Sequence, residues 1–579
     1  MFQLIFNYIK QHKWLYLLIA ALLIVYDMTM LVPTKVIQGL VDKLSSQALT
    51  AETLWTNVGI LVAATLINYL SAYIWHYKLF QGSVNFKFDM QWQAFRKLVS
   101  MRTPFYEKFR SGDMMTRFST DVEGLMEMVG YGLMIVVYAG GMIAFIIPTM
   151  FLISWQITLL AMLPMLVLMT GSYLISRKQD DLIEERRIAI AEVNNEVLEA
   201  VEGIRVTRAY SKKSVQGTRF AKRTRELSHM GDKITALQSI YHPMGSLLIG
   251  LSTTLVLFMG AHCLRLGQVS LGQVIALQLY MVSLIEPFWM LSDFVLVYQT
   301  GKTSFSKVNE LITTGDDMEA DGEKWLAKGQ DFVLENYDFA YPNADRLSLC
   351  GINWRLKAGQ TVGIVGKTGS GKTTLVRQFL RQYPLGQGTF AVDGQPITAY
   401  KRRSVEDLIG YVPQEHILFS KSVRENIALG KEDASQKEIE QAVRTAAFEG
   451  DLERMSSGLD TMIGERGVSI SGGQKQRISI ARAFLRDPDL LILDDSLSAV
   501  DARTERQIIQ NIQKERAGKT NIIVTHRLSA VNHADWVLVL DDGAIVEEGP
   551  PADLLEMGGW YYEQYQRQQT EEKGEESCA

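Results

Sequence analysis

Residues 366–373 combine glycines, a lysine and a threonine at the spacing of a phosphate-binding loop. They close the stretch TVGIVGKTGSGKTT, in which an apolar run precedes the glycines. The glycines let successive backbone N–H groups turn toward one point, while Lys372 reaches the terminal phosphates and the Thr373 hydroxyl meets Mg²⁺. An ordinary strand-to-helix turn is the alternative, but the Lys-Thr ending and the helix-compatible TLVRQFLRQ favour a nucleotide site. The predicted contacts are Gly366, Lys367, Thr368, Gly369, Ser370, Gly371, Lys372, Thr373 and Thr374.

Polar residues also end several later strand-like stretches. Gln414, in GYVPQEHILF, is placed to reach Mg²⁺ or the attacking water, and Asp494, after LLIL, suits a second metal-holding carboxylate. His526 follows NIIVT and is either a γ-phosphate contact or a structural histidine. Tyr341, in DFAYP, either stacks on adenine or packs in the core. These residues predict ATP and Mg²⁺ as ligands.

The stretch 469–477, SISGGQKQR, precedes a helix-compatible run and forms a second glycine-bearing helix N-terminus. Ser471, Gly472, Gly473 and Gln474 are its candidate phosphate contacts. No single ATP needs both sites. We therefore expect two such domains to meet head-to-tail, each presenting this stretch to the other's nucleotide.

The two halves of the chain differ in composition. With 579 residues, at least two domains are expected, and the mean hydropathy of +0.03 averages an apolar first half with a soluble α/β second half. The net charge of −5 gives no reason to expect nucleic acid. Cys263, Cys350 and Cys578 are far apart in sequence and indicate neither a disulfide framework nor a zinc site.

Six apolar spans indicate a polytopic α-helical membrane domain, because each approaches or exceeds the ~20 residues that a bilayer requires. The spans are 15–39, 56–79, 129–154, 157–177, 243–263 and 271–299. The N-terminal MFQLIFNYIKQHK resembles an interfacial amphipathic segment and not a cleaved signal peptide.

Lysine and arginine concentrate in the connections 80–128 and 178–242, whereas the other connections carry little beyond Lys43 and Arg265. The basic connections are therefore predicted to be cytoplasmic, together with both termini and the nucleotide domain. Their helical patterning indicates membrane helices that continue into the cytoplasm. Breaks at 111–113 and 210–211 would let each extension reverse and present a short helix to the nucleotide domain; a hairpin without such contact is the alternative.

The phosphate loop, Gln414, the SGGQ stretch, LLILDD, residues 498–501 and His526 follow the order of an ABC transporter ATPase. With the six spans, nearly the whole chain resembles a half-transporter of the type IV bacterial exporter group. The resemblance implies a domain-swapped dimer with two ATP-Mg sites, an adenine-stacking Tyr341, γ-phosphate contacts from Ser471 and Gly473, a nucleotide-contacting Asp501, and alternating access. It also implies coupling helices near 111–120 and 208–214. The expected domains are 1–310 membrane, 311–330 linker, 331–567 ATPase with a helical subdomain near 425–485, and 568–579 polar tail.

One residue departs from the family pattern. The residue after the Walker B aspartate is usually a glutamate that polarises water, but here it is Asp495, followed by Ser496. Aspartate is one methylene shorter, and misplacement by about 1 Å can cost ~10²-fold in rate. The site is predicted to bind ATP and cleave it slowly. The chain thus resembles the degenerate subunit of heterodimeric multidrug exporters, with a partner supplying the glutamate; a uniformly slow homodimer is the alternative.

The substrate is predicted from acids in the spans. Asp27 lies about twelve residues, roughly 18 Å, into the first span. Glu286 and Asp293 share a face of the sixth span with Trp289 and Met290, a set that suits lipophilic cations. A structural or gating role for these acids stays open. So do lipid or peptide export and, as a different class, an ATP-gated channel or regulatory subunit. The expected location is the bacterial plasma membrane.

Overall fold

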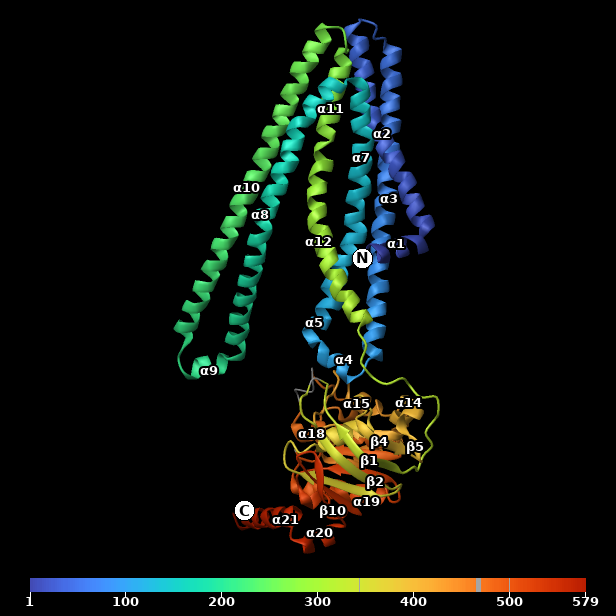
Figure 1. Cartoon of the computed structure of the whole chain (residues 1–579), viewed down its shortest axis with the longest axis vertical. Coiled ribbons are helices and arrows are strands. Elements are labelled where there is room, and N and C mark those ends of the chain that lie inside the picture. The colour runs from blue at the N-terminus through green and yellow to red at the C-terminus, as the bar shows by residue number, and fades with distance from the viewer. Residues whose placement is uncertain (343, 465–469, 499, 579) are drawn as a thin grey trace. The chain divides into compact units, whose positions relative to one another are not determined.

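The computed structural model describes residues 1–342, 344–464, 470–498 and 500–578. By its internal contacts the chain forms two compact units. The first comprises Met1–Ser100 with Ser111–Thr314, and the second comprises Met101–Arg110 with Gly315–Ala579. The first unit is all helical and the second is α/β, as the sequence predicts (Figure 1).

Long helices make up the first unit (Figure 1). They are α1 (Phe2–Gln11), α2 (Lys13–Ser45), α3 (Ala51–Ser100), α5 (Ser111–Thr116), α6 (Val122–Glu127), α7 (Leu133–Ile153), α8 (Trp155–Glu202), α9 (Ile204–Ala209), α10 (Lys213–Arg265), α11 (Leu271–Ser283) and α12 (Ile285–Thr313). Two π-helical turns, Arg117–Asp121 and Met128–Gly132, join α5, α6 and α7. Helices α8 and α10 run side by side as an antiparallel pair joined through α9.

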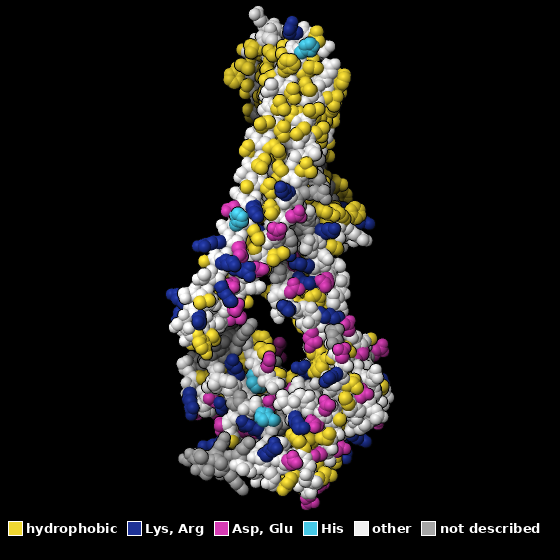
Figure 2. Space-filling model, turned by 60° about the vertical axis from the view of Figure 1, so that its left-hand side comes forward, with side chains coloured by type: hydrophobic (Ala, Val, Ile, Leu, Met, Phe, Trp, Pro, Cys, Tyr) yellow, Lys and Arg dark blue, Asp and Glu magenta, His cyan; other side chains and the backbone are white. Residues whose placement is uncertain are grey.

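Within the described residues, five helical stretches are long and apolar enough to cross a membrane. They are Lys13–Ser45, Ala51–Ser100, Ser111–Ile153, Pro243–Arg265 and Leu271–Thr313. The predicted span 157–177 lies in α8, where the described apolar stretch Trp155–Val167 is shorter, so this span stays a prediction. Hydrophobic side chains cover much of the surface of the helical unit in Figure 2. Leu66 and Phe258 are among the exposed apolar residues of the spans. Such a surface suits contact with lipid chains.

The first helix break between the membrane helices lies earlier in the sequence than expected. Residues 111–120 belong to α5 and the following π turn in the helical unit, whereas Met101–Arg110 groups with the ATPase unit. Pro104 causes the difference, because it stands in the first turn of a new helix, α4 (Thr103–Lys108), after an extended Arg102. The second break does fall at Ser211, which has a positive φ of 54°, but the short helix α9 precedes it.

Two sheets build the second unit. One has the order β2-β1-β4-β5 with antiparallel pairs, and the other has the order β10-β9-β3-β8-β7-β6. In the second sheet all pairs are parallel except β10 with β9. The strands are β1 (Phe332–Phe339), β2 (Leu349–Leu356), β3 (Thr361–Gly366), β4 (Gln387–Val392), β5 (Gln395–Pro396), β6 (Ile409–Val412), β7 (Leu490–Asp494), β8 (Thr520–Val524), β9 (Trp536–Asp541) and β10 (Ala544–Gly549).

The central strands read as continuous apolar runs because they are buried on both faces. Every residue of β7 and of β8 is buried. The helices of this unit are α4, α13 (Lys372–Phe379), α14 (Arg402–Leu408), α15 (Val423–Ala428), α16 (Gln436–Thr445), α17 (Glu449–Arg454), α18 (Gly472–Leu485), α19 (Ala502–Glu515), α20 (Pro551–Met557) and α21 (Trp560–Cys578). Chain topology therefore brings the ends of β3, β6, β7 and β8 to one sheet edge, where ligands bind in such folds.

Candidate nucleotide-binding site

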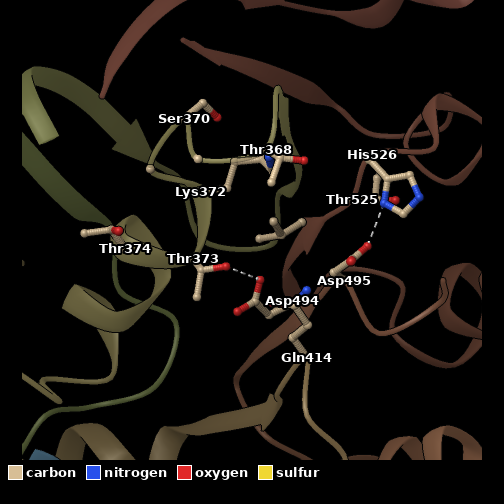
Figure 3. A pocket seen from close by; sticks show the side chains of 13 residues that line it. Thr368, Ser370, Lys372, Thr373, Thr374, Gln414, Asp494, Asp495, Thr525 and His526 are labelled. Carbon is tan, nitrogen blue, oxygen red and sulfur yellow. Dashed lines mark hydrogen bonds and ion pairs between the residues drawn. The ribbon is translucent and has the colours of Figure 1, made fainter. Parts of the chain in front are cut away.

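A cavity of about 250 Å³ lies at the carboxyl edge of the parallel sheet (Figure 3). Gly366 ends β3, Asp494 ends β7, and Thr525 and His526 follow β8, while Gln414 follows β6. The lining residues are Thr368, Gly369, Ser370, Gly371, Lys372, Thr373, Thr374, Gln414, Asp494, Asp495, Val524, Thr525 and His526. Four segments far apart in sequence thus supply one polar cavity.

The phosphate loop takes its shape from glycine. Gly371, the residue before α13, has φ +99°, and a Cβ on it would lie 2.8 Å from the carbonyl oxygen of Ser348. A Cβ on Gly366 would lie 2.1 Å from the carbonyl oxygen of Leu540. Larger residues at these two positions would move the backbone that forms the loop.

The side chain of Lys372 hydrogen-bonds to the backbone of its own phosphate loop. Its Nζ donates hydrogen bonds to the carbonyl oxygens of Gly366 at 2.9 Å and Lys367 at 2.7 Å. Burial lowers the pKa of the Lys372 ammonium, and the nearby carboxylates of Asp495 and Asp494 oppose this shift. Phosphate oxygens can replace the carbonyl oxygens as better acceptors for a buried ammonium.

Ser370 gives an independent indication that the loop fits a phosphate. Its side chain is 3% exposed, and its Oγ has no hydrogen-bond partner among the described residues. A buried hydroxyl without a partner is costly. A phosphate oxygen in the loop would supply the missing acceptor.

Asp494 is fully buried at the end of β7 and is held by two hydroxyl donors. Thr373 donates to Oδ1 at 3.1 Å and Tyr411 donates to Oδ2 at 3.1 Å. Burial raises the pKa of the Asp494 carboxyl, and the two hydrogen bonds act in the opposite direction. Tyr411 was not expected from sequence, since no motif marks it; its place on β6 beside β7 brings it there.

The oxygen atoms around Asp494 are suitable ligands for Mg²⁺. Thr373 Oγ1, the Asp494 carboxylate and the Gln414 side chain are hard oxygen ligands on one cavity wall. The described residues contain no group of three or more His, Cys, Asp or Glu that could hold a metal. Mg²⁺ needs no such group, because phosphates and water complete its shell; when bound, it neutralises charge on the β- and γ-phosphates.

Asp495 lies opposite the lysine, and His526 holds its carboxylate. The His526 Nδ1 lies 2.9 Å from Asp495 Oδ1 (Figure 3). This hydrogen bond is the main cause that raises the pKa of His526, and burial opposes it. Asp495 itself has a left-handed backbone, with φ +46°. The carboxylate of Asp495 therefore points toward the imidazole of His526.

Tyr341 and Asp501 are not part of the cavity lining. The Tyr341 hydroxyl lies 3.1 Å from Thr374 Oγ1 and accepts a hydrogen bond from Arg377 Nη1 at 3.3 Å. Asp501 caps α19 by accepting from the backbone N–H groups of Arg503 and Thr504. These hydrogen bonds lower the pKa of Asp501. The nucleotide-contacting roles of both residues stay predictions.

The SGGQ residues begin helix α18 and lie outside the cavity lining. Ser471 caps the helix, and the side chains of Ser471 and Gln474 form a capping box. Asp451 anchors this end by accepting from Gln474 Nε2 at 3.1 Å and pairing with Arg477 at 2.7 Å. Ser469 and Ala499, which belong to the quoted motifs, lie outside the described residues. The phosphate-contacting role of the SGGQ residues stays a prediction.

The acids of the spans occupy two different settings. Asp27 is 3% exposed, and neither carboxylate oxygen has a partner among the described residues. Glu286 and Asp293 are exposed, and Asp293 accepts from the Tyr131 hydroxyl at 3.3 Å. The Asp27 carboxylate is thus enclosed among the helices, whereas Glu286 and Asp293 lie at the surface.

The two apolar residues predicted to contact the substrate, Trp289 and Met290, both pack against neighbouring helices. A Cβ on Gly245 would lie 2.7 Å from the Trp289 ring, so the ring packs closely on α10. Met290 packs against the core of the helical unit.

Family models match both halves of the chain. The ABC transporter transmembrane region matches residues 16–288, and the ABC transporter model matches residues 349–498. The chain belongs to the ABC transporter family, with an ATPase that couples ATP hydrolysis to transport. This confirms the predicted family, fold class and enzyme class.

Within the ABC transporter family, the chain is most usefully compared with three relatives of the exporter type. The chain is 40% identical over 566 residues, 97% of both chains, to the "Probable multidrug resistance ABC transporter ATP-binding/permease protein YheI" of Bacillus subtilis. It is 33% identical over 569 residues to the "Multidrug resistance-like ATP-binding protein MdlA" of Escherichia coli, covering 97% of this chain and 96% of that one. It is 28% identical over 513 residues to an "ATP-dependent lipid A-core flippase" of Escherichia coli, covering 88% and 87%.

A solved structure has the same fold. A bacterial Atm1-family ABC exporter with ATP bound superposes with a TM-score of 0.82 over 96% of this chain and 99% of that one, at 24% identity.

Proposed function

We propose that this chain is one half of a heterodimeric exporter in the bacterial plasma membrane, and that its own Walker site cleaves ATP slowly. Export driven by ATP is the activity of its family. The heterodimer, the slow site and the substrate class are the proposal.

The hydrogen bond between Asp495 and His526 carries the proposal of a slow site. A general base must reach the attacking water. The Asp495 carboxylate is one methylene shorter than the usual glutamate, and its Oδ1 already pairs with His526 at 2.9 Å. Polarising a water would require Asp495 to leave this partner and to span the missing length.

The capped start of α18 supports a competent site on a partner. The SGGQ residues keep their phosphate-contacting groups, and their helix N-terminus lies outside the chain's own cavity. We infer that this stretch completes the nucleotide site of a partner that carries the glutamate. The partner is then the faster hydrolase.

We propose lipophilic cations as substrates, with lipids or peptides as the rival. Relatives named for multidrug resistance and the acids of the spans support cations. The relative named as a lipid A-core flippase supports a lipid. Inverted vesicles distinguish them: ATP should drive accumulation of a cationic dye, whereas movement of a fluorescent lipid without dye accumulation favours the rival.

The proposed function is tested by purifying the chain alone and together with the product of the neighbouring gene. We expect slow ATP hydrolysis from the chain alone and a large gain from the pair, further stimulated by drug. A brisk, drug-independent ATPase from the chain alone contradicts the heterodimer and the slow site together.

A further inference from the structure

Tyr383 contacts both the loop segment Met101–Arg110 and the ring of Tyr341. The Tyr383 and Tyr341 ring centroids are 4.9 Å apart with an interplanar angle of 85°, an edge-to-face pair. The Tyr383 hydroxyl donates a hydrogen bond to the Glu107 carboxylate. All of these residues belong to the ATPase unit.

The loop segment Met101–Arg110 is fixed to the ATPase unit at several points. Arg102 forms an ion pair with Glu406, and the Lys108 Nζ lies 2.5 Å from Asp317 Oδ2. Phe105, in the same segment, is fully buried. The segment is also the covalent connection between α3, which ends at Ser100, and α5, which begins at Ser111. The segment that carries Glu107 is therefore covalently linked to both helices.

Tyr341 is held from the opposite direction by the helix of the phosphate loop. Its hydroxyl contacts Thr374 and Arg377, both on α13. The Phe339 ring packs on it at 5.2 Å between centroids. The orientation of the Tyr341 ring is thus set by α13 on one side and by Tyr383 on the other.

Tyr383 has little freedom to move independently of Glu107. Its side chain is 1% exposed, and a buried hydroxyl that loses its acceptor pays a desolvation penalty. Burial and the Glu107 hydrogen bond both raise the pKa of Tyr383, so it stays a neutral donor. If Glu107 moves, the ring of Tyr383 must follow or leave its donor unpaired.

We propose that Tyr383 is a positioning residue that couples adenine binding at Tyr341 to the position of the loop segment Met101–Arg110. This inference rests on the proposed adenine-stacking role of Tyr341. Coupling between two sites is reciprocal. The nucleotide base therefore shifts the segment, and the segment alters affinity for the base.

The test uses the full chain in lipid nanodiscs, with an environment-sensitive fluorophore on Arg110→Cys after Cys263, Cys350 and Cys578 are replaced by serine. MgATP and magnesium tripolyphosphate, which has the phosphates but no base, are titrated separately. We expect ATP to change the fluorescence beyond the tripolyphosphate response. Tyr383→Phe and Glu107→Ala should remove that additional, base-specific change and leave the tripolyphosphate response and its dissociation constant unaltered.

Glu107→Gln is the matched control, because its amide oxygen still accepts from Tyr383; it should retain the base-specific signal. Merely structural damage would weaken both ligands alike, and that result overturns the proposal. So does an ATP-specific signal that persists in Tyr383→Phe, or a parent protein that responds identically to both ligands. Failure of the heterodimer or of cation export shows in ATPase and vesicle assays and does not alter this readout.

Discussion

His526 Nδ1 lies 2.9 Å from Asp495 Oδ1, a contact that joins the second residue after β8 to the first residue after β7. The two side chains expected to act on the γ-phosphate and on the attacking water thus contact each other. The length of the side chain at position 495 decides whether both contacts can be made at once.

Asp495→Glu is expected to accelerate hydrolysis at the chain's own site. A longer side chain restores a carboxylate at the distance that a water requires, and we expect a gain of up to about 100-fold in turnover. The measurement is steady-state ATPase of the complex with the neighbouring gene product, whose own catalytic glutamate is changed to glutamine. Asp495→Asn serves as the control and should give no gain.

The pH dependence of stability should report the bond between His526 and Asp495. Because the folded pKa of His526 is raised above about 6.5, its contribution is complete below that pH and is lost as pH rises through the folded value. The melting temperature of the parent should exceed that of His526→Asn most near pH 6, and the gap should shrink by about pH 8.5. The histidine is more than half exposed, so the effect is small. A gap that widens with pH contradicts the assignment.

Lys372→Ala should weaken ATP binding by about 10- to 100-fold, the value of a charge-assisted hydrogen bond. The ammonium that now bonds to the loop carbonyls is lost, so no cation remains at that point of the loop. Nucleotide binding is measured by equilibrium titration with a fluorescent ATP analogue. Lys357→Ala, an exposed lysine of the same unit, should bind as the parent does.

Asp27→Asn tests whether a buried carboxylate recognises cations. We expect ATP-driven accumulation of a cationic dye in inverted vesicles to fall by about tenfold or more, with a neutral dye unaffected. Gly141→Ala is the packing variant, because a Cβ there would lie 2.1 Å from Asp27 Oδ2. It should impair both dyes. Unaltered export of the cationic dye in Asp27→Asn combined with Glu286→Gln would remove these acids from substrate binding.

Much of the fold was predictable because local patterns match the tertiary environment. Continuous apolar runs such as 490–493 form buried parallel strands, and the glycine and lysine spacing at 366–373 defines a strand-to-helix loop. Parallel strands of one sheet align their carboxyl ends, so distant polar residues were expected at one edge. Resemblance to the ABC family supplied the expected order of the motifs.

The remaining features depend on contacts that have no local pattern. Tyr411 hydrogen-bonds to Asp494 because β6 pairs with β7, and sequence spacing does not encode that register. The serine and glycine at 111–112 predict a break at Ser111, whereas the helix break falls before α4. Pro104 is the better signal, since a proline in the first turn favours the start of a helix, here α4 after the extended Arg102.

Residues 101–110 belong to the ATPase unit although they are translated long before the rest of it. The loop segment Met101–Arg110 is therefore synthesised before residues 315–579, which form the rest of the ATPase unit. A polypeptide beginning at residue 315 would lack the acceptor for Tyr383 and the ionic partners of Glu406 and Asp317. The ATPase unit therefore includes a segment that the chain supplies from between α3 and α5, so a fragment cut at residue 315 is not the complete unit.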